Sequence, residues 1–105
     1  MIRARLFCDS EGSCTGYRIE GHAGYAENDA DDIVCAAVSV LAVTCCNTLE
    51  RVLGKAPEAR QGDGLLEVHL AGKASRESEI IFRFLREGLE ELQETYPAYV
   101  SLKVL

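Results

Sequence analysis

A cysteine and a histidine in the first third of this chain could act together in nucleophilic catalysis. Cys35 falls in the expected first turn of a long helix, and His22 lies in a glycine-containing loop ahead of it. Unpaired N–H groups and the helix dipole at a helix start favour a thiolate. An imidazole could take the thiol proton and later give it to a leaving amine. The same free N–H groups could hold an oxyanion, so the stretch contains the parts of a cysteine-nucleophile site.

Each of these two residues also has an ordinary structural interpretation. Cysteine is among the residue types most often buried, and Cys35 lies in an apolar helix. A single histidine in a loop, such as His22, often only packs or faces solvent. The spacing of the pair does not decide between these interpretations, so the neighbouring residues must.

Two polar residues flank Cys35 at positions that could support it. Asp31 or Asp32 could cap the helix, because a carboxylate accepts the unpaired N–H groups of the first turn. Asp32 either caps the helix or pins the loop before it; alternatively it orients His22. Ser39 lies four residues after Cys35 and therefore shares its helix face. Its hydroxyl either bonds near the thiol or bonds back to the Cys35 carbonyl.

The loop after His22 begins with small residues and one aromatic residue. Gly21 and Gly24 allow close backbone approach or a positive φ. Tyr25, followed by Ala26, is either an anchor for the loop or a wall of a substrate groove. We expect this segment to contact a substrate.

The other cysteines do not form a recognisable metal or redox motif. The chain has five cysteines, an odd number, and none is spaced as CxxC. Cys8 and Cys14 flank a turn and could approach each other, but a reducing compartment disfavours a disulfide. The spacings do not fit a structural zinc site, so we predict neither a metal nor a cofactor.

Hydrophobic periodicity predicts the elements that position these residues. Alternating segments predict strands, and apolar residues at helical spacing predict two helices, the first ended by Gly54 and the second capped by Ser75 and closed by Pro97. The predicted strands cover 2–8, 15–20, 56–61, 65–70 and 98–105, and the first helix covers 33–53.

The resulting order, ββαββαβ, predicts an α+β fold in which two helices cover a five-stranded, mostly antiparallel sheet. A chain of 105 residues is expected to form one domain, 1–105. The first helix is apolar nearly all round, which favours a central place. The second is amphipathic, with a predicted apolar stripe made of Ile81, Phe84, Leu85, Leu89 and Leu92.

The net charge and the N-terminal segment indicate which classes of binding partner and which cellular location to expect. Eleven Lys and Arg residues against 17 Asp and Glu give a net charge of −6, which argues against direct nucleic-acid binding. The first residues do not form a signal peptide, and the apolar run from Ile33 to Val43 is too short for a membrane span. We therefore expect a cytoplasmic protein without membrane contact.

Short sequence motifs around Cys35 and His22 resemble those of a known family. The runs Gly-His-Ala, Tyr-Ala and Asp-Ile-Val-Cys-Ala-Ala-Val-Ser are similar to the signature of the ribosomal-processing cysteine proteases, the Prp family. The length and the element order resemble that family over the whole chain.

The resemblance implies a function and a set of site residues. It implies a dimeric cysteine endopeptidase that removes the N-terminal extension of a large-subunit ribosomal protein and so supports ribosome assembly. It places the nucleophile at Cys35 and the base at His22, with Asp32 and Ser39 at the family's supporting positions. It also implies that the loop between histidine and cysteine is mobile and covers the substrate.

Two further expectations complete the sequence analysis. The alternative function is a non-catalytic ribosome-assembly or protein-binding module, since fold alone does not define function. Uncovered apolar residues of the first helix favour a homodimer, although a central helix can also be fully buried in a monomer.

Overall fold

A computed structural model describes residues 1–105, apart from the side chain of Asp29. Its elements follow the predicted order, with one short 3-10 helix, Asp29–Asp31, in the loop before the first long helix. The strands and helices are β1 (Ile2–Cys8), β2 (Cys14–Glu20), α1 (Ile33–Leu53), β3 (Glu58–Gly62), β4 (Leu65–His69), α2 (Arg76–Thr95) and β5 (Val100–Val104).

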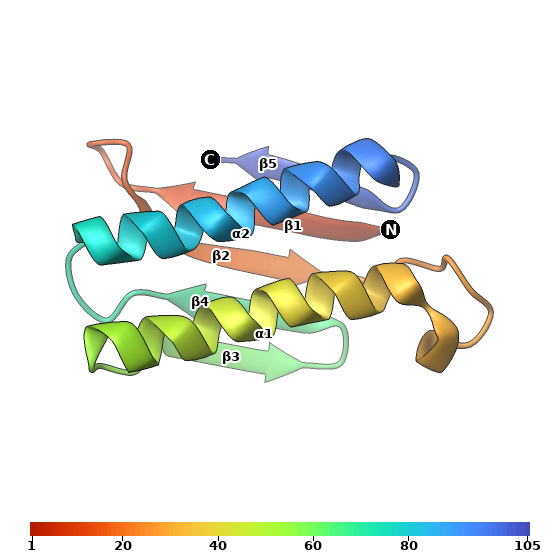
Figure 1. Cartoon of the computed structure of the whole chain (residues 1–105), viewed down its shortest axis with the longest axis horizontal. Coiled ribbons are helices and arrows are strands. Elements are labelled where there is room, and N and C mark those ends of the chain that lie inside the picture. Colours follow the sequence, from red (N-terminus) through yellow and green to blue (C-terminus); the bar gives the residue numbers. More distant parts are fainter.

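The five strands form one sheet in the order β3-β4-β2-β1-β5. Three neighbouring pairs are antiparallel, and only β1 and β5 run parallel. Both helices lie side by side on the same face of this sheet (Figure 1). The predicted α+β fold with two helices and a mostly antiparallel five-stranded sheet is therefore confirmed.

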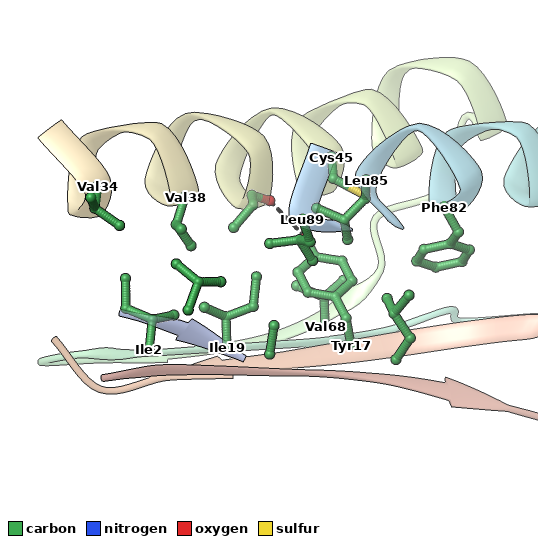
Figure 2. Close-up of a cluster of buried hydrophobic side chains, with 14 of the residues drawn as sticks. Ile2, Tyr17, Ile19, Val34, Val38, Cys45, Val68, Phe82, Leu85 and Leu89 are labelled. Atoms are coloured by element: carbon green, nitrogen blue, oxygen red, sulfur yellow. Dashed lines mark hydrogen bonds between the residues drawn. The ribbon is translucent and has the colours of Figure 1, made fainter. Parts of the chain in front are cut away.

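The core fills the space between the two helices and the sheet (Figure 2). Alternate residues of the strands point toward the helices, as the period of a strand requires. The Tyr17 hydroxyl donates a 2.7 Å hydrogen bond to the Ala42 carbonyl, which ties β2 to the middle of α1. The largest fully buried side chains are those of Tyr17, Phe82, Leu6, Leu49, Leu85 and Leu89.

The predicted apolar stripe of α2 was wrong at one aromatic residue. Phe82 is 1% exposed and packs edge-on to Tyr17, whereas Phe84 is 73% exposed. Phe82, Leu85 and Leu89 are separated by three and four residues and so share one face. Phe84 lies two positions from Phe82, about 200° around the helix, and therefore points to solvent.

The predicted central place of α1 was also wrong. The helix lies beside α2 rather than beneath it (Figure 1), and its outer apolar residues are exposed. Val40 is 65% exposed, and Ile33, Val43 and Val52 are exposed as well. The reason is that a sheet covered on one face offers each helix only one buried side.

Helix α1 has the length and composition of a membrane-spanning helix. The apolar run considered in the sequence analysis ended at Val43 and was therefore too short to indicate this. The helix continues to Leu53 and is 21 residues long. Its inner face packs on the sheet through Val34, Val38 and Leu49. That face makes α1 part of the core of this domain.

Candidate active site

A cleft of about 280 Å³ opens between the first half of α1 and the β3–β4 hairpin. Cys35 and Ser39 line it from α1, and Gly21 and His22 line it from the end of β2. The fold thus brings together four residues selected from the sequence. The rest of the lining is mostly apolar and includes Ile2, Ile19, Val38, Val43, Leu65 and Leu66.

The Cys35 thiol lies in the first turn of α1 and is half-buried. Its sulfur accepts a 3.3 Å hydrogen bond from the backbone N–H of Ala23, the residue after His22. The same bond fixes the chain next to His22 against the helix start.

The N–H groups at the start of α1 are occupied, which contradicts the expectation that they are free to hold an oxyanion. Asp32 Oδ1 accepts from Val34 and Cys35, both at 3.0 Å, and the Asp32 carbonyl accepts from Ala36 at 3.0 Å. The physical reason is the N-cap itself, since a capping carboxylate takes the donors of the first turn.

The second Asp32 oxygen holds the loop that follows His22. Asp32 Oδ2 accepts from the backbone N–H groups of Tyr25 at 2.9 Å and Ala26 at 3.4 Å. The Cys35 N–H, followed by the loop N–H groups, lowers the pKa of Asp32, which is 2% exposed. All four hydrogen bonds of this carboxylate go to backbone, so the geometry fits a cap and loop anchor rather than a partner of His22.

Tyr25 packs away from the cleft as a second anchor of the loop. Its ring makes edge-on contacts with Tyr96 and Tyr99, with centroid distances of 5.5 and 5.2 Å. Gly24, one residue earlier, has a φ of 68°, a conformation that favours glycine. The anchor interpretation of Tyr25 therefore fits the structure, and Gly24, Tyr25 and Ala26 lie outside the cleft lining.

His22 is held by contacts that the sequence did not reveal. Its side chain is 48% exposed, and Nε2 lies 3.6 Å from Asp63 Oδ1. The Met1 amino group donates a 2.7 Å hydrogen bond to the His22 carbonyl. Asp63 belongs to the turn between β3 and β4, a glycine-rich turn that in sequence looks like any hairpin connection.

Ser39 is exposed at the edge of the cleft. Among the described residues it makes neither of the two predicted hydrogen bonds, to the thiol or to the Cys35 carbonyl. In contrast, Thr48 does bond back to the Thr44 carbonyl at 2.7 Å on the same helix. The Ser39 hydroxyl is thus available to a molecule bound in the cleft.

Three of the other four cysteines differ from Cys35 in their surroundings. Burial raises the pKa of Cys14 to about 11 and that of Cys45 to about 12, and it also raises the pKa of Cys46. Such thiols hold few thiolates at neutral pH. The described part of the chain contains no group of three or more His, Cys, Asp or Glu that could hold a metal ion.

The fold and the cleft define a small α+β domain in which a helix-start cysteine and a histidine line one cleft. A family model for the cysteine protease Prp matches residues 1–101. The chain belongs to the Prp family of cysteine proteases.

Solved structures with the same fold agree with this assignment. An essential ribosomal processing protease Prp from S. aureus, in complex with a covalently linked product peptide, has a TM-score of 0.92 and 23% identity, with 100% of both chains covered. SMU.848 from Streptococcus mutans has a TM-score of 0.84 and 27% identity, covering 100% of this chain and 94% of its own. At 23% identity, the similarity to the S. aureus protein shows that the two chains share a fold. No curated protein sequence matches the chain significantly.

Proposed function

We propose that this protein is a cysteine endopeptidase with Cys35 as nucleophile and His22 as general base and acid. The observation that carries the proposal is that both residues line one cleft, in a chain of the Prp family. We further propose that its substrate is the N-terminal extension of a large-subunit ribosomal protein. A cytoplasmic location follows from that substrate.

The proposed reaction proceeds through a thioester. The Cys35 proton moves to the His22 imidazole, and the thiolate attacks the scissile carbonyl carbon. As the tetrahedral intermediate collapses, the C–N bond breaks and His22 gives the proton to the leaving amine. A water molecule then loses a proton to His22 and attacks the thioester carbon, and the C–S bond breaks. His22 returns its proton to the thiolate, and the released carboxylic acid loses its own proton to solvent.

The oxyanion requires donors other than the first-turn N–H groups, because Asp32 already occupies those of Val34 and Cys35. The exposed Ser39 hydroxyl is the candidate donor on the cleft side of α1. We propose that it binds the substrate near the scissile bond.

Three features support the proposed substrate. The S. aureus relative is described as a ribosomal processing protease and holds a peptide. The apolar lining beside Cys35, including Ile19, Val38 and Leu66, fits an apolar or aromatic side chain of a peptide. The net charge of −6 attracts a basic protein such as a ribosomal protein.

The decisive experiment incubates the protein with the precursor of a candidate ribosomal protein and reads the new N-terminus by mass spectrometry. The proposal predicts one defined cut within the N-terminal extension. A precursor that binds but stays intact would instead identify a non-catalytic binding module. A precursor that neither binds nor is cut would exclude this substrate.

We also propose a homodimer formed through the outer side of the two helices. An apolar groove of about 360 Å³ between them is lined by exposed residues of both, including Val40, Ile80 and Phe84. Twofold symmetry is the commonest way to cover such a face. Light scattering of Phe84→Glu against the wild type tests it: we expect a dimer that becomes a monomer. A wild-type mass near 11.5 kDa at all concentrations would exclude the dimer.

A further inference from the structure

The turn between β3 and β4 packs directly on the imidazole of His22. A Cβ atom built on Gly64 would lie 2.8 Å from His22 Nε2 and 3.2 Å from Cδ2. The first distance is shorter than real Cβ contacts and the second is tighter than most, so a side chain at this position would force the ring to shift. Gly64 also has a φ of 63°, which other residues rarely adopt. The backbone of the turn therefore forms one wall around the ring.

Each residue of the segment from Gly21 to Ala23, which contains His22, is held by a hydrogen bond of its backbone. The Gly21 N–H donates to the Gly64 carbonyl at 2.8 Å, which ties the turn to the residue before the histidine. The Met1 amino group bonds to the His22 carbonyl, and the Ala23 N–H bonds to the Cys35 sulfur. The segment around His22 is thus held by three parts of the chain: the β3–β4 turn, Met1 and Cys35.

The turn also supplies a negative charge. Asp63 Oδ1 lies 3.6 Å from His22 Nε2, and the Asp63 side chain is 98% exposed. A carboxylate at this distance can orient the ring. Two further ionisable groups lie around this segment, the Met1 amino group and the Cys35 thiol.

We propose that the β3–β4 turn is the positioning element of His22, with Gly64 as the surface against the ring and Asp63 as its acidic partner. The inference rests on the proposed function of His22 as base. Both residues act through the imidazole, and Gly64 also lines the cleft. The turn therefore sets the orientation of the base.

The first experiment records the ring resonances of His22 by NMR in the wild type and in Asp63→Asn. We expect these resonances to move in Asp63→Asn, because the ring loses the carboxylate that orients it. Glu58→Gln is the matched control, because it removes an acidic charge at the far end of the same hairpin, opposite His69. It should leave the His22 resonances in place. Unmoved His22 resonances in Asp63→Asn would overturn the role of Asp63.

The second experiment compares Gly64→Ala with Gly12→Ala. Both glycines have positive φ, but a Cβ on Gly12 meets nothing within 4 Å. We expect Gly64→Ala to move the His22 ring resonances and to lower kcat at least about tenfold with a smaller change in KM. Gly12→Ala should do neither. Unmoved His22 resonances in folded Gly64→Ala would overturn the proposal. The NMR measurement does not depend on protease activity, so an inactive wild-type protein would contradict the proposed function without deciding the role of the turn.

Discussion

Half-buried cysteines line a cavity at each end of the β1–β2 pair, and only one of them is the proposed nucleophile. At one end Cys35, on α1, lines a cleft of about 280 Å³. At the other, Cys8 and Cys14 face each other in register and line a larger cavity of about 630 Å³. Cavity size alone would favour the end opposite to the proposed site.

The direction of a single hydrogen bond distinguishes the two kinds of thiol. The Cys35 sulfur accepts from the Ala23 N–H at 3.3 Å. The Cys14 thiol donates to the Gly16 carbonyl at 3.5 Å, and burial raises its pKa to about 11. Among the described residues, His22 lines only the smaller of the two cavities, and no histidine lines the larger. The proposed nucleophile thus differs from Cys14 in the hydrogen bond at its sulfur and in the histidine that lines the same cleft.

The sharpest test of this contrast replaces one cysteine at each end. We expect Cys35→Ala to reduce cleavage of the precursor by at least about a thousandfold, because the nucleophile is lost. Cys14→Ala should keep the wild-type rate. Both rates are measured by mass spectrometry on variants whose circular dichroism shows the native fold. Cleavage by folded Cys35→Ala at the wild-type rate would contradict the assignment of the nucleophile.

The second test removes each histidine. We expect His22→Ala to lower kcat by about 10²–10⁴, the range for loss of a general base, with little change in Tm because the side chain is half-exposed. The control is His69→Ala, on the opposite face of the sheet, where the ring stacks on Phe7 at 5.4 Å. Should His22→Ala lower the Tm strongly while activity per folded molecule is kept, His22 would be structural.

The third test compares thiol reactivity directly. We expect iodoacetamide at pH 7.5 to label Cys35 before Cys14 and Cys45, since raised pKa values leave those thiols protonated. Peptide mass spectrometry over time gives each rate. A Cys8→Ser background removes the other half-buried thiol at the far end. Equal labelling of Cys35 and Cys14 would remove the contrast between the two ends.

The smallest expected effect concerns Asp32. Asparagine can keep the helix cap through its one oxygen, but its amide nitrogen cannot accept from the N–H groups of Tyr25 and Ala26. We therefore expect Asp32→Asn to lower the Tm by several degrees and to reduce activity less than His22→Ala does. Calorimetry and the cleavage assay give the two values.

The pH dependence of that Tm difference follows from the lowered pKa of Asp32. A carboxyl with a lowered pKa stabilises the fold above its ordinary pKa of 3.8, and this contribution is lost as the pH falls through the lower value in the folded protein. The Tm difference between wild type and Asp32→Asn should therefore be full at neutral pH and shrink below about pH 4. A difference that is constant with pH would contradict the role of the charged carboxylate.

Local patterns were sufficient to predict the elements, because strand alternation and helix caps depend on neighbouring residues. Asp32, Gly54 and Ser75 all cap helices where the sequence indicates. The face of a helix is harder to predict when apolar residues surround it, so Phe84 was assigned to the core in place of Phe82. The position of α1 depends on the whole sheet and was not predictable from its own residues.

The candidate site was predictable only in part for the same reason. Cys35 and His22 were found through their local sequence, and the fold places both at one cleft. The contact of Gly64 with His22 joins residues from separate hairpins, and no local pattern signals it. One oxygen of the Asp32 carboxylate accepts from the N–H groups of Val34 and Cys35 at the start of α1. Residue spacing alone does not show which donors a carboxylate will bind.

The parallel pairing of β1 with β5 has a consequence for folding. β1 lies inside the sheet, yet one of its two neighbours comes from the far end of the sequence, with Ile2 aligned to Val100. Pairs that are distant along the chain close slowly, because a long loop must lose its freedom before the contact forms. We therefore expect β5 to join the sheet last, so that β1 has its hairpin partner β2 before it gains its second neighbour.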